Sequence, residues 1–220
     1  MRSVHVDRFN HDEDADGYDV HVQDERNLIR RGYAACLHAV AQDLSRAPML
    51  PDLPMVDLGV GTGNLAMALP ADRPLVLVDI SAAMLARAQA KLEGRTVTIV
   101  QDDALSWLTD HEGPLGTVGS TFALHHLDPP EKVHLLDALV RRLAPGARVC
   151  IGDLGFQDAR AQDAFLASEG CPPEVADAIA DEFFWDFSLA EKWLVNAGFK
   201  VRRRAHGPLI GSLVAMRDED

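Results

Sequence analysis

Cysteine is scarce in this sequence of 220 residues, which contains only Cys36, Cys150 and Cys171. The three are odd in number, widely spaced and form no CxxC pair, which argues against a disulfide framework or a zinc site. Long apolar runs are also missing: none reaches the roughly 18 residues that a membrane-spanning helix needs. The acidic N-terminus lacks the apolar core of a secretion signal. We therefore expect a cytoplasmic protein that has no membrane partner.

Basic residues are outnumbered, with 21 Lys and Arg against 34 Asp and Glu, so the formal net charge is -13 at pH 7. An acidic chain repels the phosphate backbone, and we expect no nucleic-acid partner. The one basic cluster, Arg202-Arg203-Arg204, is interpreted as the solvated face of a C-terminal strand. Apolar residues make up 47% of the chain, which is enough for the core of a single domain over residues 1–220.

Short apolar runs alternate with helical patterns through the middle of the chain. Strands that alternate with helices are typical of a parallel, doubly wound sheet, because each helix carries the chain back to start the next strand. Ser81 is placed to cap one of these helices. The expected strands are 55–58, 75–78, 96–100, 115–121 and 148–151, and the expected helices are 64–69, 82–92 and 129–143.

The two ends of the chain depart from this alternation. Apolar residues recur at helical spacing over 24–44, and residues 1–50 are interpreted as an N-terminal lid and helix ahead of the sheet. Residues 154–187 are interpreted as a helical insert after the fifth strand. The last two strands are joined by a short turn, which requires them to be antiparallel. The elements expected after the fifth strand are helices at 159–169, 173–184 and 188–197 and strands at 199–205 and 209–216.

The strongest motif is the glycine-rich turn after the first strand, Asp57-Leu58-Gly59-Val60-Gly61-Thr62-Gly63. Glycine tolerates positive φ angles and lets a ligand approach the backbone closely. Asp79 follows Gly59 by 20 residues at the end of the second strand, where a carboxylate can accept hydrogen bonds from both ribose hydroxyls. Together these features indicate a ligand that contains adenosine.

Two cofactors and a purely structural turn compete as explanations of this loop. The dinucleotide fingerprint has glycine at relative positions one, three and six, whereas here position six is Asn64. This spacing favours S-adenosylmethionine (SAM) over NAD. The run Asp102-Asp103-Ala104 supports SAM, because a carboxylate there can accept from the adenine amino group, and one aspartate is also expected to cap the next helix. Met84 lies four residues after Ile80 and can pack against the adenine or belong to the core.

The order VDLGVGTG, LVDIS, QDDAL, STFALHHL and LAPGARV resembles that of the class I SAM-dependent methyltransferases over roughly residues 53–153. More narrowly, DGYD at 16–19, GVGTGNL, FALHHL and NAGFKV resemble the small YrrT-like methyltransferases associated with methionine and cysteine sulfur salvage. The resemblance implies a Rossmann-like α/β fold with a doubly wound seven-stranded sheet. Its implied strand order is 3-2-1-4-5-7-6, with strand 7 antiparallel.

The resemblance also implies SAM as the cofactor and gives roles to individual positions. The glycine loop and the end of strand four would surround the methionine part and the sulfonium of SAM. The end of strand two would bind the ribose, and the segments that follow it in the chain would bind the adenine. Tyr18 is expected to fold over SAM from the lid, although it can also anchor the first helix. The residues expected to bind SAM are Tyr18, Asp57, Gly59, Val60, Gly61, Asp79, Ile80, Met84, Asp103, Ala104, Thr121 and Ala123.

His125 and His126 are the candidates for catalysis, because they follow strand four at the edge where open α/β sheets bind ligands. A histidine can take a proton from the acceptor near neutral pH, or it can cap the following helix instead. Asp153 is expected to end strand five and to face the same site. No metal site is expected, since the histidines and acids lack ligand spacing, and the acidic stretch Asp12–Asp16 is interpreted as a solvated segment.

The sequence therefore predicts a SAM-dependent methyltransferase that acts on a small-molecule acceptor. The alternatives are a SAM-binding module without catalysis and, from a different class, a nucleotide-dependent oxidoreductase. The acceptor, the atom that is methylated, the use of a base and the oligomeric state stay open at this stage.

Overall fold

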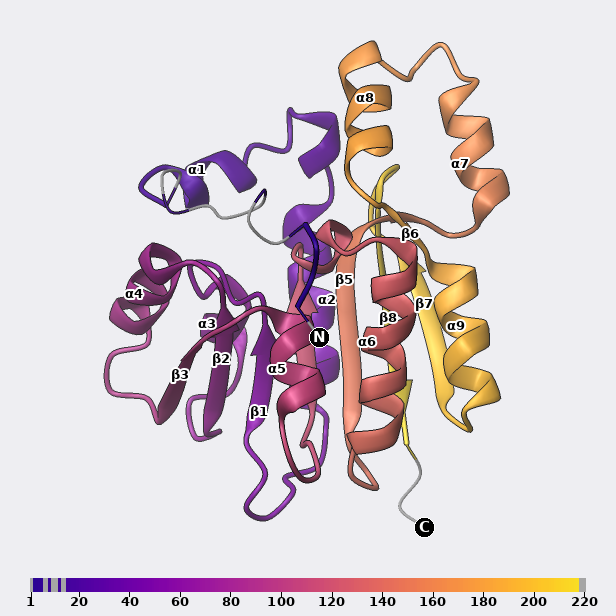
Figure 1. The fold of residues 1–220 in the computed structure, drawn as a ribbon. Helices are drawn as coiled ribbons and strands as arrows, with labels where there is room; N and C mark the ends of the chain where they lie inside the picture. The colour runs from indigo at the N-terminus through magenta and orange to yellow at the C-terminus, as the bar shows by residue number, and fades with distance from the viewer. Residues whose placement is uncertain (1, 6–7, 9–11, 13–14, 218–220) are drawn as a thin grey trace.

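The apolar runs of the βα repeat form the parallel strands of one sheet in the computed structural model, which describes residues 2–5, 8, 12 and 15–217. These strands pair in the order β3-β2-β1-β4-β5. Their side chains are mostly buried because helices cover both faces of the sheet (Figure 1). The strands are β1 (Met55–Leu58), β2 (Leu75–Asp79), β3 (Val97–Gln101), β4 (Val118–Thr121) and β5 (Arg148–Phe156).

The last two long strands, β7 (Lys200–Ala205) and β8 (Ile210–Met216), form the predicted antiparallel hairpin. β8 lies between β7 and β5 and runs antiparallel to β5. The main path is therefore β3-β2-β1-β4-β5-β8-β7. This path confirms the predicted order 3-2-1-4-5-7-6 once the short strand β6 (Trp185–Asp186), which pairs with the end of β5, is left aside.

The described residues form a large hydrophobic core on each face of the sheet and a smaller cluster, which contains Val175 and Ile179, between the helical insert and β5. The first large core lies under α5, α6 and α9, and the second lies under α2, α3 and α4. The capping predictions also hold: the Ser81 side chain accepts from the Met84 N–H at the start of α4. The helices are α2 (Tyr33–Ser45), α3 (Asn64–Ala68), α4 (Ala82–Lys91), α5 (Ala104–Asp110), α6 (Pro129–Arg142) and α9 (Phe187–Asn196).

The N-terminal helix begins later than the sequence pattern predicts. Instead of starting near residue 24, it starts at Tyr33, after a short helix α1 (Tyr18–Val22) and a 3₁₀ turn η2 (Leu28–Arg30). Gly32 explains the break, because its φ of 102° is left-handed and its position is crowded. A Cβ on Gly32 would lie 2.3 Å from the backbone oxygen of His206, so only glycine lets the hairpin turn approach the start of α2.

β5 also extends further than predicted, and β4 starts later. β4 begins at Val118 rather than at residue 115, while β5 continues to Phe156 rather than ending at residue 151. Gly152, which interrupts the apolar run, lies where a Cβ would be 2.6 Å from the sulfur of Cys36 on α2. This glycine therefore permits close packing inside a continuing strand, and Asp153 lies within β5 instead of at its end.

The helical segment after β5 consequently starts beyond Phe156 and not at residue 154. We call residues 157–186 the insert; it contains α7 (Ala159–Leu166), α8 (Pro173–Asp181) and β6. We call the described residues at the start of the chain, 2–5, 8, 12 and 15–22, the N-terminal segment. Figure 1 shows α1 above the β1–β3 side of the sheet and α7 and α8 above the β5–β7 side, so both additions lie at the carboxyl ends of the parallel strands.

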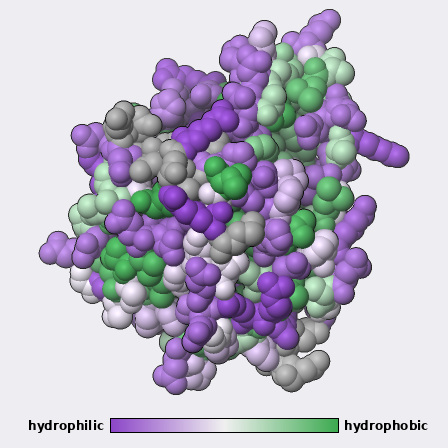
Figure 2. Space-filling model, viewed as in Figure 1, coloured by the Kyte–Doolittle hydropathy of each residue, from purple (hydrophilic) through white to green (hydrophobic). Residues whose placement is uncertain are grey.

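The surface is largely hydrophilic on the face that Figure 2 shows, and hydrophobic side chains form separate patches there. Within the residues that the structure describes, no helix has both the length and the apolarity that crossing a bilayer requires.

Candidate active site

The glycine loop after β1 has the backbone that its sequence predicts. Gly59, Gly61 and Gly63 have φ angles of 67°, 52° and 86°, all in the left-handed region. A Cβ on Gly59 would lie 2.2 Å from the Cβ of Ala123, whereas a Cβ on Gly61 would meet no atom within 4 Å. Gly59 is therefore required for packing, and Gly61 leaves open space beside the loop.

Asp79 at the end of β2 joins two loops. One carboxylate oxygen accepts from the Gly61 N–H at 2.7 Å, and the other accepts from the Ser81 N–H at 2.9 Å. Hydrogen bonds to a charged acceptor are stronger than neutral ones. This carboxylate therefore fixes the glycine loop relative to the start of α4, at the position that the sequence predicts for the ribose.

Asp57 lies below the loop in a different environment. Its side chain is buried, and neither carboxylate oxygen has a hydrogen-bond partner among the residues that the structure describes. Burial raises the pKa of Asp57 to about 8; the nearby charge of Asp79 adds to this, and the backbone of Ala66 opposes it. The pKa of Asp57 is thus strongly raised, but Asp57 does not line the cavity described below.

Two roles are expected for the aspartates after β3, namely capping the next helix and binding the adenine. Asp103 caps α5 by accepting from the Ser106 N–H at 2.8 Å, and it also accepts from the Ser3 N–H at 3.3 Å. Burial raises the pKa of the Asp103 carboxyl, and these two N–H donors oppose that effect. Asp102 accepts from the Asp103 N–H at 2.8 Å. The helix-capping prediction is thus confirmed for Asp103, while both carboxylates reach the same cavity.

A cavity of about 100 Å³ brings most of the expected site residues together at the carboxyl edge of the sheet. It lies at the junction of the loops after β1, β2, β3 and β4 and is partly walled by the N-terminal segment. The expected residues on its wall are Tyr18, Gly59, Gly61, Asp79, Ile80, Met84, Asp103, Ala104, Ala123 and His126.

Four expected residues do not line this cavity: Asp57, Val60, Thr121 and His125. Val60 is buried in the core beneath the loop. His125 points into the protein and pairs with Asp153. Sequence position places these residues near the site, but it does not reveal on which side of the backbone each side chain lies.

The wall also contains Asp102, which the sequence places beside the adenine, and four residues that the sequence reasoning missed: Ser3, Phe122, Leu124 and Leu127. Three of them belong to the FALHHL motif, whose position after β4 is the signal that could have identified them. Phe122 has a φ of 53°, which is uncommon for a residue with a bulky side chain, and it stacks on Tyr33 at 4.6 Å. Ser3 has no local signal, because it reaches the site through a contact distant in sequence.

Acidic residues bind the N-terminal segment to α3 and α4. Asp19 accepts from Thr62 Oγ1 at 2.5 Å and pairs with Lys91 Nζ at 2.5 Å. Asp12 accepts from Ser81 Oγ at 2.5 Å, and Asp16 pairs with an arginine of α4. Asp12 and Asp16 are exposed, in keeping with the solvated segment that the sequence predicts, and each also contacts α4 or the residue that caps it.

The charge state of Asp19 agrees with this attachment. Partial burial would raise the pKa of its carboxyl, but the hydrogen bonds from Lys91, Thr62 and Asn64 more than compensate and lower it. Tyr18, the next residue, lines the cavity, and burial raises its pKa to about 12. Tyr18 therefore faces the site as a neutral phenol.

Comparisons with known proteins agree with this geometry. Residues 55–146 match the family described as a methyltransferase domain. An uncharacterized methyltransferase of Bacillus cytotoxicus is 30% identical over 151 residues, which are 67% of this chain and 69% of that protein. The chain belongs to the SAM-dependent methyltransferase family. Another uncharacterized methyltransferase, from Geobacillus kaustophilus, is 33% identical over 152 residues, which are 69% of this chain but only 65% of that protein.

Solved structures show the same fold. The magnesium protoporphyrin IX methyltransferase ChlM from Synechocystis, crystallised with bound SAH, has a TM-score of 0.65 and 20% identity, and the match covers 97% of both chains. SAM is the cofactor of this family. The narrower likeness to the YrrT-like branch stays a prediction.

The two histidines of the methyltransferase occupy different positions after β4. His126 lines the cavity, whereas the His125 ring is buried, with Nδ1 2.6 Å from Asp153 Oδ1. The two ring centroids are 4.0 Å apart. Of the two catalytic candidates, only His126 is placed to meet a ligand in the cavity.

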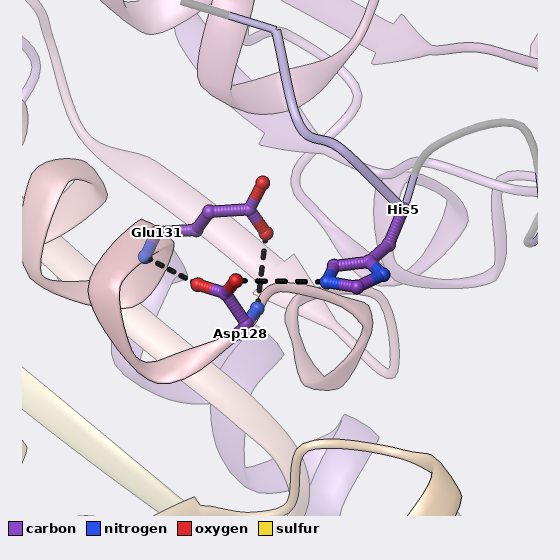
Figure 3. A group of neighbouring side chains, drawn as sticks. All are labelled: His5, Asp128 and Glu131. Atoms are coloured by element: carbon purple, nitrogen blue, oxygen red, sulfur yellow. Dashed lines mark hydrogen bonds and ion pairs between the residues drawn. The ribbon is translucent and has the colours of Figure 1, made fainter.

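One further cluster of His and acidic residues lies beside the site, at the start of α6 (Figure 3). His5 Nε2 is 3.5 Å from Asp128 Oδ2, and Asp128 and Glu131 form a capping box in which each side chain accepts from the other's N–H. Glu131 also accepts from the Val4 N–H at 2.8 Å. The carboxylates thus cap α6 and hold the N-terminal segment, and these bonds explain the cluster as a structural joint.

Proposed function

We propose that this methyltransferase transfers the methyl group of SAM to a small molecule in a pocket that the N-terminal segment covers. The observation that carries the proposal is the path of this segment. It binds Asp103 after β3 through Ser3, the start of α4 through Asp12, and the glycine-loop side through Asp19. A macromolecular acceptor could reach the cavity only if this segment were displaced.

The residues around the cavity fit SAM. Gly61 leaves room where a side chain would otherwise stand, and Asp79 offers a carboxylate at the end of β2 for ribose hydroxyls. Ile80 and Met84 supply apolar surface for the adenine, and Asp103 supplies an acceptor for its amino group. SAM, when bound, supplies a methyl group activated by a sulfonium leaving group, so the chain needs mainly to position the acceptor and exclude water.

His126 is the proposed general base. It lines the cavity at the end of β4 and is flanked there by the apolar residues Phe122, Leu124 and Leu127. A neutral imidazole in this place can take a proton from a hydroxyl, amine or thiol as that atom is methylated. The apolar neighbours favour an acceptor with an apolar body close to its nucleophilic atom.

The size of the site indicates that the cover moves when SAM and the acceptor bind. The cavity of about 100 Å³ is well below the roughly 300–1,000 Å³ typical of pockets for drug-sized ligands. Some opening of the cover is therefore part of the proposed cycle. A net charge of -13 adds electrostatic repulsion against nucleic acid.

The cover has a second part. The insert reaches the N-terminal segment through His5 and Phe183, whose ring centroids are 4.9 Å apart, and through Arg8 and Asp181 at 3.6 Å. We propose that the segment and the insert close together over SAM and the acceptor and exclude water that would compete for hydrogen bonds. All three cysteines are unpaired, in keeping with the cytoplasmic location that we propose.

The decisive experiment is SAM turnover with a panel of small hydroxyl, amine and thiol compounds, followed by mass spectrometry of the products. His126→Asn should lower kcat by about 10²–10⁴ on a proton-bearing acceptor, with SAH affinity unchanged. His134→Asn, which alters an exposed histidine on α6, is the matched control and should leave turnover intact. SAM binding with no turnover on any small acceptor would favour a binding module, and unchanged turnover in His126→Asn would exclude His126 as the base.

A further inference from the structure

Asp153 is a buried hub beneath the proposed site. Its side chain is 0% exposed, and its two oxygens accept four N–H groups. Oδ2 accepts from the Leu124 backbone at 2.9 Å and from Trp185 Nε1 at 3.2 Å. Oδ1 accepts from its neighbour Leu154 at 2.8 Å and from His125 Nδ1 at 2.6 Å. A carboxylate can accept about four hydrogen bonds, so the donors from the turn after β4, from β5 and from β6 use all the acceptor sites of Asp153.

This arrangement fixes the tautomer of His125. Because the Asp153 carboxylate can only accept, the hydrogen on the neutral ring of His125 must be on Nδ1. The other nitrogen, Nε2, then faces Glu182 Oε2 at 3.7 Å. In the neutral ring, Nε2 presents a lone pair to a carboxylate, which is unfavourable. In the cationic ring, Nε2 carries a hydrogen, and the same contact becomes an ion pair.

Glu182 belongs to the end of the insert, directly after α8. The next residue, Phe183, donates its backbone N–H to the His125 oxygen at 3.0 Å, and its own oxygen accepts from Lys132 on α6. The end of the insert is therefore bound to the turn that carries His126. The contact between Glu182 and the buried His125 ring is part of that attachment.

We propose that His125 is a positioning residue that couples the end of the insert to the wall of the pocket, with proton uptake on Nε2 tightening its contact with Glu182. The inference deepens the proposed function, because the same turn presents His126 to the acceptor. The titratable groups that face this ring are Asp153 from β5, Glu182 from the insert and His126 from the same turn. Lys132 lies close by, over the Trp185 ring at 4.8 Å.

Lys132 sets the upper limit of the pH range for a test. Burial lowers the pKa of its ammonium to about 8, while the charge of Asp153 and of the acids that cap α6 opposes this effect. Measurements below pH 7 therefore keep Lys132 cationic and report on the histidine.

The test is an NMR titration of the histidine side chains in the ligand-free protein. The wild-type protein should show the Nδ1–H tautomer for neutral His125. Glu182→Gln should lower the pH midpoint of His125, because it removes one of the two carboxylates that favour the cation. Glu169→Gln makes the same chemical change at an exposed position elsewhere in the insert and should leave the midpoint in place.

Hydrogen exchange of peptides spanning 178–186 provides the second readout. Below the midpoint, exchange in Glu182→Gln should be about two- to fivefold faster than in the wild type, as expected for a partly exposed ion pair. Glu169→Gln should match the wild type. An Nε2–H tautomer, an unmoved midpoint, or equal exchange in all three proteins would overturn the proposal. Since no ligand is present, these results are independent of SAM binding, which calorimetry tests separately.

Discussion

Replacing Asp57 by asparagine should make the protein more stable at neutral and alkaline pH. Asp57 is 1% exposed, and its carboxylate oxygens have no hydrogen-bond partner within the described part of the chain. Its ionised form is therefore costly in the folded state, and the negative charge of Asp79 increases the cost. Asparagine keeps the shape of the side chain and removes the charge.

The magnitude follows from the pKa of the Asp57 carboxyl. A value of about 8 in the folded protein, against about 3.9 in an unfolded chain, corresponds to a free-energy difference on the order of 5 kcal/mol. Because the folded state holds this proton more tightly than the unfolded state, stability is fully present below about pH 4 and is lost as the pH rises toward about 8. Asp57→Asn lacks this loss of stability, so the difference in the free energy of unfolding between the variant and the wild type should grow from about pH 4 to about pH 8.

Urea unfolding at several values between pH 4 and pH 8 measures the effect. The free energy of unfolding of the wild type should fall relative to that of Asp57→Asn as the pH rises, by several kcal/mol at the upper end. Asp177→Asn, at an exposed position of α8, is the control and should follow the wild type. If the free energy of unfolding changed with pH in the same way for the wild type and Asp57→Asn, the argument would be refuted. That result would mean that a hydrogen-bond donor satisfies the ionised carboxylate.

Three further predictions concern the cofactor site. Asp79→Asn should weaken SAM binding by about 1–3 kcal/mol in calorimetry, because it removes a charged acceptor; an unchanged dissociation constant would place the ribose elsewhere. Gly61→Val should abolish SAM binding but keep a native circular dichroism spectrum. Gly59→Val should instead destabilise the fold, because of these two positions only Gly59 has another atom within reach of a new Cβ. The reverse pattern would contradict the roles given to these two glycines. Asp19→Asn should speed hydrogen exchange in α1 and speed SAM release by about two- to fivefold, and an effect that 1 M salt leaves unchanged would argue against an electrostatic latch.

The parts of the fold that the sequence predicted well are those with local signals. β1 has the predicted bounds, and Ser81 caps α4, because a strand, a glycine turn and a capping residue each leave a pattern within a few positions. The sheet order followed from the family resemblance. Two glycines made the predicted bounds wrong for opposite reasons. Gly32 breaks the N-terminal helix, whereas Gly152 allows close packing within the continuing strand β5.

The side-chain network of the site could not be predicted in the same way. Asp153 was expected at the end of its strand, yet it lies inside β5 and binds partners that come 29 residues earlier and 32 residues later in the chain. Ser3 reaches Asp103 across 100 residues. Such contacts depend on how distant segments meet, and one sequence carries no periodic signal for them. The two adjacent histidines could not be told apart until the backbone showed which of them lines the cavity.

The two kinds of contact around the site differ in strength, and the difference suits a pocket that must open. The N-terminal segment is held by hydrogen bonds, such as that from Ser3 to Asp103, and also by ion pairs at the surface, such as that between Asp16, which is 93% exposed, and Arg87. Exposed pairs of this kind contribute about 0–1 kcal/mol each, so these ion pairs can break at modest cost. Asp153 and His125 are 0% and 5% exposed, and leaving a buried polar group without its hydrogen-bond partner costs about 1–3 kcal/mol or more. We therefore expect the wall that presents His126 to stay fixed while the cover moves, with the acidic stretch near the N-terminus acting as a reversible latch.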